Sequence, residues 1–315
     1  MSKETNQQHM TSIGGSALRE GVMMRGPKDI ASAVRTPSGE IVVDKRPVSS
    51  LVTKYHVNKI PIVRGVFAFF DSLICSMRAL MWSAEFFDLE DDSVEPSKFD
   101  KWLTEKLGDK LKDYVIYFSV FISVIFSVGL FFILPNLVTG FLHRFVENNV
   151  LMSLIEGVLR IAIFLGYILI VSQMEEIKRV FQYHGAEHKT IFCYEAGLPL
   201  TPENARKMSR LHPRCGTSFL VFVMIISIIL FSFISWNNMF VRIGLRLLML
   251  PVVAGVSYEI IRWAGRSQNK VVCLISKPGM MLQKITTREP DDSQLEVAIA
   301  SMQAVLTGNK EDDKW

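Results

Sequence analysis

The chain has 315 residues, of which 49% are hydrophobic and 21% charged, with a mean hydropathy of +0.26 and a net charge of +4. The charged fraction is too high for a protein that is membrane throughout, and the apolar fraction is high for an ordinary soluble domain. The basic residues form no dense block, so nucleic acid is not an implied partner. We therefore expect long apolar runs that alternate with polar segments of domain-like composition.

The first polar part of the chain, residues 1–60, is predicted to be a cytosolic, β-rich segment. Strands are expected at residues 22–25, 30–35 and 41–43, and residues 37–40 have the composition of a hairpin turn between the last two. The first ten residues are polar, so we expect no cleavable signal peptide.

A glycine-dense stretch, residues 14–27, overlaps the first of these strands. Its spacing matches neither the dinucleotide-binding nor the P-loop fingerprint. Because glycine allows close backbone approach and positive φ, turns and tight sheet packing are the favoured interpretation. The polar groups of this stretch that we consider for function are Glu20 and Arg25.

Residues 61–89 are predicted to form a largely apolar helix with one narrow polar stripe. The stripe consists of charges of alternating sign that recur every seven residues: Arg64, Asp71, Arg78 and Glu85. An amphipathic helix lying on the membrane or against a helical bundle explains this pattern. The alternative is that the stripe lines a polar cavity within the bundle. A charged linker is expected to follow at residues 90–113.

Two runs without any formal charge predict transmembrane helices. They cover residues 115–142 and 216–241, which is 28 and 26 residues. Both exceed the roughly 20 residues that cross a hydrocarbon core. Water-soluble helices are rarely apolar around their whole circumference for this length.

Two further spans, residues 150–173 and 243–262, are predicted although they carry charges. Glu156 and Arg160 stand four residues apart with the acid first, the favourable order for a helical ion pair. Arg246 lies near one end of its span, where a long side chain can reach the interface. The alternative is a pair of helices lying partly outside the membrane.

The distribution of Lys and Arg predicts the orientation. These residues are frequent in the loop 175–215 and in both end segments, whereas the links near 143–149 and 236–242 hold one arginine each. The positive-inside rule then places both termini and the loop in the cytosol. The predicted location is a cell membrane.

The last part of the chain, residues 263–315, is predicted to hold a short strand at 271–275 and a helix at about 294–306, capped by residues 290–293. The expected fold class is a multi-pass α-helical membrane protein with about four transmembrane helices, in segments 114–174 and 216–262. A small cytosolic α+β domain is expected to combine the N- and C-terminal segments, because neither alone buries much core.

The sharpest motif is Tyr183-His184-Gly185-Ala186-Glu187-His188-Lys189, which contains H-x-x-E-H. On a helix, His184 and His188 stand one turn apart on the same face, so both imidazoles can reach one zinc ion. Glu187 is a candidate ligand or base for water activated by the metal. Two histidines at this spacing also occur as a hydrogen-bonded structural pair, and Gly185 weakens the helix by about 1 kcal/mol relative to Ala.

A second cluster lies at the other end of the same loop, where His212 and Cys215 offer a third and fourth ligand. All four cysteines of the chain, Cys75, Cys193, Cys215 and Cys273, lack the spacing of a disulfide framework, as expected for reduced cytosolic thiols. If the two flanking spans are antiparallel neighbours, the loop ends meet at the cytosolic membrane face and assemble a metal site.

Two other interpretations of the second cluster stay open. Thr217 or Ser218 has the side chain of a helix N-cap, with Gly216 as a tight entry into the helix. Alternatively, Arg210 and Arg214 and the N–H groups of the helix start bind an anion such as a lipid phosphate.

Several strings of this chain together resemble the YqhQ-like family of bacterial membrane proteins. They are Gly14-Gly15 with Glu20-Gly21-Val22-Met23-Met24-Arg25-Gly26-Pro27, then Tyr183-His184-Gly185-Ala186-Glu187-His188-Lys189-Thr190, then His212-Pro213-Arg214-Cys215-Gly216-Thr217-Ser218, and Thr286-Thr287-Arg288-Glu289-Pro290-Asp291-Asp292. The resemblance implies a multi-pass bacterial membrane protein described as a predicted metal-dependent enzyme, and it names no substrate. The family commonly has Gln and Ala-Val-Ile where this chain has Ser16-Ala17-Leu18-Arg19, which weakens any catalytic role for Ser16.

Three functions are compatible with these observations. The first is a membrane metalloenzyme, most plausibly a hydrolase, with a divalent metal such as zinc on His184, His188 and His212 or Cys215, and with Glu187 as the proton-transfer group. The second is a non-catalytic scaffold or assembly factor with a structural metal. The third is a transporter or lipid-handling protein that uses the charged stripe. The expected partners are the lipid bilayer and either a second copy of the chain or another membrane protein.

Overall fold

The computed structural model describes residues 9–87, 111–142, 148–233, 239–265 and 270–314. Most of the predicted linker 90–113 therefore lies outside the described residues. The chain divides into two compact units. The first holds residues 1–87, 168–227 and 248–315, and the second holds residues 88–167 and 228–247.

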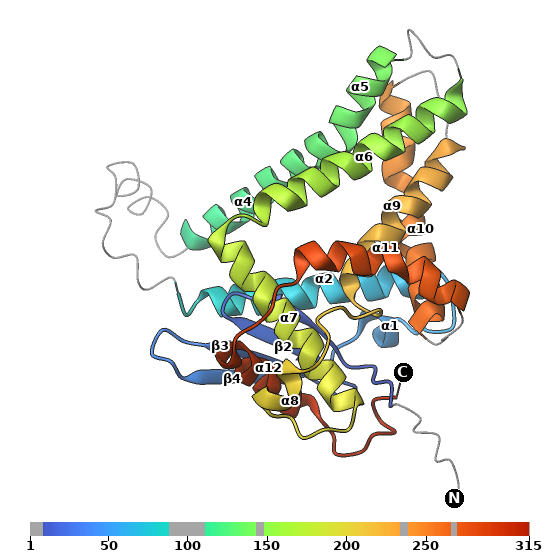
Figure 1. Ribbon diagram of the computed structural model, residues 1–315. Coiled ribbons are helices and arrows are strands. Elements are labelled where there is room, and N and C mark those ends of the chain that lie inside the picture. The colour runs from blue at the N-terminus through green and yellow to red at the C-terminus, as the bar shows by residue number, and fades with distance from the viewer. Residues whose placement is uncertain (1–8, 88–110, 143–147, 234–238, 266–269, 315) are drawn as a thin grey trace, which may run out of the picture. The chain divides into compact units, whose positions relative to one another are not determined.

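The described fold is mostly helical, with a small antiparallel sheet near the N-terminus (Figure 1). The strands are β1 (Gly14–Leu18), β2 (Gly21–Arg25), β3 (Asp29–Arg35) and β4 (Ile41–Pro47). The helices of the described residues are α1 (Leu51–Lys54), α2 (Val63–Ala84), α4 (Leu111–Val128), the π-helix η2 (Gly129–Ile133), α5 (Leu134–Leu142), α6 (Asn149–Val171), α7 (Glu175–Glu195), α8 (Pro202–Arg206), α9 (Gly216–Ser232), α10 (Met239–Gly265), α11 (Lys270–Thr286) and α12 (Asp292–Val305).

The sheet has the order β1-β2-β3-β4, and every neighbouring pair is antiparallel. The three predicted strands are confirmed as β2, β3 and β4, although β4 continues to Pro47. The predicted hairpin turn is also confirmed, with Gly39 at a φ of 89° and the N–H of Thr36 donating to the carbonyl of Glu40. The strand β1 was not predicted, because its glycines indicated turns.

Helices cover the sheet on both faces, which follows from the alternation of side chains along each strand. One face packs with α7 and α12 through Val22, Met24, Ala31 and Ala33. The opposite face packs with Ala79 of α2 through Leu18, Met23 and Val34. The sheet thus connects α7 with α2, two helices that contribute to the site described below.

The predicted helix near the C-terminus is confirmed as α12 (Asp292–Val305). Its start is a capping box, in which the Asp291 carboxylate accepts from the N–H of Gln294 at 2.9 Å and the Gln294 side-chain oxygen accepts from the N–H of Asp291 at 3.0 Å. The helix packs against β2 and β3, so segments from both ends of the chain share one core.

The strand predicted at residues 271–275 is wrong, because these residues lie in α11 (Lys270–Thr286). A short apolar run has the same composition in a buried strand and in a helix, and its periodicity does not separate the two. Pro278 and Gly279, which were expected to end a strand, lie inside the helix. A Cβ at Gly279 would stand 2.5 Å from Oγ of Ser218, so this glycine allows α11 to approach α9 closely.

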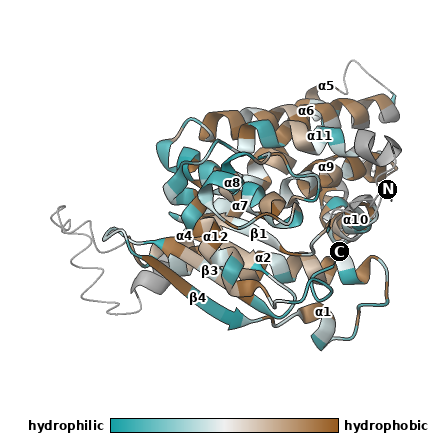
Figure 2. Ribbon diagram, turned by 60° about the horizontal axis from the view of Figure 1, so that its bottom comes forward, coloured by the Kyte–Doolittle hydropathy of each residue, from teal (hydrophilic) through white to brown (hydrophobic). Residues whose placement is uncertain are grey.

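Four helices are long and apolar enough to cross a membrane, judged by length and composition. They are Val63–Ala84, Phe118–Leu142, Leu154–Val171 and Ile243–Trp263. Hydrophobic residues predominate along α6 and α9 in Figure 2, whereas α8 is hydrophilic. The helix α2, expected to lie on the membrane or against a helical bundle, is thus one of the four candidates. The described part of α9 is shorter than the predicted span 216–241 and ends at Ser232.

Two residues of the charged stripe on α2 form ion pairs within the first unit. Arg64 contacts Glu259 of α10 at 2.5 Å, and Asp71 contacts Arg25 of β2 at 2.6 Å. The helices α2 and α10 also approach closely, since a Cβ at Gly65 would stand 3.0 Å from the backbone of Gly255. These contacts support the interpretation that α2 lies against other helices.

The second unit buries a cluster of charged side chains. The predicted pair Glu156–Arg160 is confirmed at 2.8 Å. Arg246, expected to reach outward from a span end, is instead 3% exposed and pairs with Glu156. The Nε of Arg160 donates to the carbonyl of Phe131 in η2 at 3.0 Å. The glutamate neutralises part of the arginine charge, which is costly to bury unpaired.

Gly185 provides a test of the packing around α7. A Cβ at this position would overlap the carbonyl oxygen of Arg288. We expect Gly185→Ala to destabilise the fold by about 1–3 kcal/mol despite the better helix propensity of Ala. Thermal unfolding of the purified protein measures the effect. Gly166→Ala in α6 is the matched control, because nothing lies within 4 Å of its Cβ position, and it should leave stability unchanged or raised. Equal stability of the two variants would contradict the close packing.

Candidate metal centre

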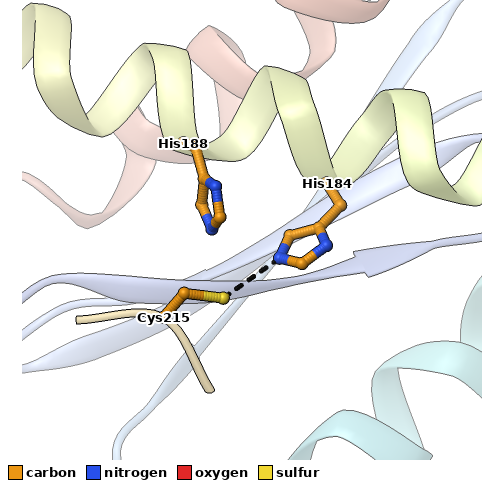
Figure 3. Close-up of side chains that lie close together, drawn as sticks. All are labelled: His184, His188 and Cys215. Carbon is orange, nitrogen blue, oxygen red and sulfur yellow. Dashed lines mark hydrogen bonds between the residues drawn. The ribbon is translucent and has the colours of Figure 1, made fainter. Parts of the chain in front are cut away.

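The helix α7 carries the H-x-x-E-H motif, as the spacing predicts. His184 and His188 lie on one side of this helix and point toward Cys215, which precedes α9 (Figure 3). The ligand atoms of these three residues all lie within 4.8 Å of one another. Nε2 of His184 and Sγ of Cys215 are 3.2 Å apart. Two ligands of a tetrahedral zinc stand about 3.5 Å apart, so the three side chains are close to the required arrangement.

Backbone carbonyls orient both imidazoles. Nδ1 of His184 lies 2.9 Å from the carbonyl oxygen of Thr286, and Nδ1 of His188 lies 2.6 Å from that of Arg210. A carbonyl oxygen only accepts, so each Nδ1 carries a hydrogen, and each Nε2 is the nitrogen that a metal can bind when it is not protonated. This is the outer-shell pattern that metal-binding histidines show.

The Nε2 atom of His188 is the observation that points most directly to a ligand. It is buried and has no hydrogen-bond partner among the described residues. A buried polar nitrogen without a partner costs about 1–3 kcal/mol of stability. A metal ion between His184, His188 and Cys215 would satisfy this nitrogen, so the residues present fit such an ion.

Cys215 occupies the N-cap of α9, and Sγ accepts from the N–H of Thr217 at 3.4 Å. The expectation that Thr217 or Ser218 caps this helix is therefore wrong. The reason is that α9 begins at Gly216, so Thr217 and Ser218 already lie inside its first turn. The positive end of a helix dipole and a donated N–H both favour a thiolate over a thiol.

The ionisation of His184 and Cys215 is coupled. Burial alone would raise the pKa of the Cys215 thiol, but the charges of His184 and His188 hold it well below its ordinary value. Burial alone would lower the pKa of His184, yet the Cys215 thiolate and its hydrogen bond raise it to about 9. The pair is therefore thiolate and imidazolium at neutral pH when no metal is present.

Glu187 lies beside the three ligands and is 5% exposed. Burial raises the pKa of its carboxyl, while the backbone N–H of Gly15 donates to it. A side chain at Gly15 would crowd this contact, since its Cβ would stand 3.1 Å from Cδ of Glu187. Glu187, His188 and Cys215 line a common cavity of about 230 Å³.

His212 is placed next to this group but is not one of its three members in the described residues. Its ring centroid is 5.6 Å from that of His188, and Nε2 lies 3.8 Å from the carboxylate of Glu195. Burial lowers the pKa of His212. The side chain of Gln283 holds the backbone of His212 from both sides, by accepting from its N–H and donating to its carbonyl, each at 2.8 Å.

The remaining polar candidates form ion pairs. Glu20 pairs with Arg179 and accepts from the Tyr183 hydroxyl at 3.2 Å, which joins the β1–β2 turn to α7. Arg25 pairs with Asp71, as described above, and Arg214 pairs with Glu195. Both arginines also line the cavity beside Glu187.

The geometry gives little support to an anion site at the start of α9. Arg210 donates to Oγ1 of Thr287 at 2.9 Å and lies 3.3 Å from Glu289, while Arg214 is engaged by Glu195. Carboxylates that already accept from these guanidinium groups compete with a bound anion.

Sequence reasoning missed the residues that support the histidines. Glu195 joins Arg214 to the N-terminal segment, since it also accepts from the N–H of Thr11 at 2.9 Å. For Gln283 the available signal was a polar side chain next to the apolar run Met280-Met281-Leu282, whereas Glu195 had no distinct signal in the polar helix α7. The backbone carbonyls of Thr286 and Arg210 could not be identified from the sequence, because every residue has a backbone carbonyl.

The metal-free protein allows a test of the thiolate. We expect iodoacetamide to alkylate Cys215 at pH values well below 9, because the His184 imidazolium stabilises the thiolate until it loses its proton near pH 9. His184→Gln should raise the pH of half-maximal labelling. Peptide mass spectrometry measures the modification, and Cys193, whose pKa burial raises, is the internal control. A midpoint at or above pH 9 in the unaltered protein would refute the coupling.

Comparison with known proteins gives a family. Residues 60–308 match the family described as protein of unknown function (DUF1385). The chain is also 35% identical over 300 residues to the uncharacterized protein YqhQ of Bacillus subtilis (strain 168), which covers 94% of this chain and 92% of that protein. No solved structure gives a significant match. The chain therefore belongs to the DUF1385 family, of which the YqhQ resemblance was the first indication.

Proposed function

We propose that this protein is a membrane-integrated, metal-dependent enzyme of the hydrolase type. His184, His188 and Cys215 would hold a divalent metal, with zinc as the first choice because two imidazoles and a thiolate suit it. The observation that carries the proposal is the buried Nε2 of His188, which has no partner among the described residues and faces the other two ligand atoms.

The number of ligands favours catalysis over a structural role. Three protein ligands leave one position open for water or substrate, as in catalytic zinc sites, whereas structural sites use four. When bound, the metal supplies Lewis acidity that makes water a nucleophile near neutral pH.

Glu187 is suited to move the proton in such a reaction. Its carboxyl is buried beside the ligands and lines the same cavity as His188 and Cys215. Because its pKa lies above the ordinary value, the carboxylate exchanges protons closer to neutral pH than an exposed glutamate does. The Gly15 N–H fixes one side of the carboxylate and leaves the other side toward the cavity.

The alternative is a non-catalytic scaffold or assembly factor with a structural metal. It would require a fourth protein ligand, for which His212 is the nearest histidine. Nε2 of His212 instead faces the carboxylate of Glu195. The transporter or lipid-handling alternative depends on the stripe of α2, and two stripe residues, Arg64 and Asp71, are already engaged in ion pairs.

The metal is tested by elemental analysis of detergent-purified full-length protein. We expect about one equivalent, and loss of it in the double variant His184→Ala/His188→Ala. His56→Asn is the matched control, because His56 is exposed, has a positive φ that Asn tolerates, and lies outside the cluster. Less than about a tenth of an equivalent in the unaltered protein would overturn the proposal.

We also propose that the chain is a multi-pass protein of the bacterial cell membrane with both termini in the cytosol. Support comes from the three long apolar helices Phe118–Leu142, Leu154–Val171 and Ile243–Trp263, from the shorter apolar helix α9 and from the basic loop 175–215. In this arrangement the hydrophobic helix α2 does not cross the bilayer but lies along it.

Reporter fusions test this topology. Alkaline phosphatase, which is active only outside the cytosol, should be active after residue 145 and inactive after residues 60, 95, 200 and 315. Activity after residue 95 but not after residue 60 would show that α2 crosses the membrane, contrary to the proposal.

A further inference from the structure

The cavity beside the candidate metal centre adjoins a second, larger cavity. The second cavity has a volume of about 400 Å³ and is lined by residues of α2, α9 and α10. The two cavities share five lining residues, namely Ser72, Ser76, Arg214, Cys215 and Gly216. The two cavities therefore lie side by side, one at Glu187 and His188 and the other between the apolar helices.

The chemistry of the walls changes along this space. The first cavity has the charged side chains Arg25, Glu187 and Arg214. The second is lined mainly by apolar side chains, including Ala68, Phe69, Phe219 and Ile261. The rings of Phe69 and Phe219 stack with centroids 5.4 Å apart. We call this second cavity the apolar groove.

The apolar groove lies between helices with membrane-like surfaces. Both α2 and α10 are long and apolar enough to cross a bilayer. Leu73 and Leu220, which line the groove, are 47% and 42% exposed. Apolar side chains exposed to this degree at a cavity indicate contact with an apolar ligand or with the hydrocarbon of a membrane.

We propose that the apolar groove holds the hydrocarbon chain of a membrane lipid whose polar group lies in the first cavity, beside His184, His188 and Cys215. The inference rests on the proposed function and deepens it, because it makes a lipid the substrate of the metal centre. The polar end of the lipid lies at the polar wall of the first cavity, which holds Glu187 and the ion-paired Arg25 and Arg214, and the chain lies along a wall made mostly of apolar side chains.

A hydrophobic peptide is the competing occupant. A peptide brings an N–H and a carbonyl with every residue, and each costs free energy when it is buried without a partner. The hydroxyl groups that line the apolar groove near its junction, Ser72 and Ser76, are shared with the first cavity. Outside the shared part, the groove has the hydroxyl groups of Thr217 and Tyr258, but most of its wall is aromatic or aliphatic and suits a hydrocarbon chain better than a backbone.

The test uses full-length protein loaded with Co²⁺, whose visible absorption reports ligands at the metal, and hydroxamates as metal-binding probes. Acetohydroxamate has almost no chain, whereas laurohydroxamate carries a long alkyl chain. The groove variant is Ala68→Trp, and the control is Leu80→Trp at an exposed position of α2 outside the groove. Cobalt uptake by Ala68→Trp shows that its metal site is folded.

We expect the variants Ala68→Trp and Leu80→Trp to bind acetohydroxamate with equal affinity. We expect Ala68→Trp to bind laurohydroxamate at least tenfold more weakly than Leu80→Trp does. Tenfold corresponds to about two buried CH₂ groups at about 0.8 kcal/mol each. Partition of the probe into the detergent micelle affects both variants equally and cancels in their ratio. An equal affinity of both variants for laurohydroxamate would overturn the inference.

Two further results decide between the possibilities. The first uses a hydrophobic tripeptide hydroxamate. If Ala68→Trp weakens the binding of this probe but not the binding of laurohydroxamate, the groove is a peptide site and the lipid proposal is overturned. The second applies if no Co²⁺ binds, in which case the proposed function fails. The lipid proposal for the groove is then tested by photolabelling of the metal-free protein with a diazirine-bearing palmitic acid. Labelling of α2 and α9 that falls in Ala68→Trp but not in Leu80→Trp supports the lipid chain, and equal labelling refutes it.

Discussion

Two hydrogen bonds from imidazole Nδ1 atoms to backbone carbonyls determine the geometry of the candidate centre. The acceptors are the carbonyls of Thr286, at the end of α11, and Arg210, in the loop before α9. The histidines themselves belong to α7. The arrangement of Nε2 atoms around Cys215 therefore exists only when three segments, distant in sequence, have packed together. Gly185 permits one part of this packing, because its missing side chain admits the backbone of Arg288 against α7.

The two faces of the sheet pack against different helices, α7 with the histidines on one face and α2 with the apolar groove on the other. Val22 and Met24 of β2 pack on the side of α7, while Met23 and Arg25 of the same strand contact α2. A displacement of β2 would consequently move the helix with the histidines and the helix with the apolar groove together.

Local patterns predicted the parts of the fold that local chemistry determines. The alternation of β2 to β4, the turn at Gly39, the capping residue Asp291 and the spacing of His184 and His188 all have signals within a few residues. The failures share a different cause. The secondary structure of the β1 glycines and of the apolar start of α11 depends on packing partners elsewhere in the chain. The backbone carbonyls that accept from the histidines have no side-chain signature in the sequence.

The charged cluster of the second unit has a consequence for biosynthesis. Glu156 and Arg160 lie on one helix, so in the proposed membrane topology α6 enters the bilayer as an electrically neutral segment. Arg246 is synthesised some ninety residues later, and its buried partner is the same Glu156. In that topology the later helix carries a cation whose partner belongs to a helix that was inserted before it. The order of synthesis and the distribution of charge together favour one pairing of these helices over any other.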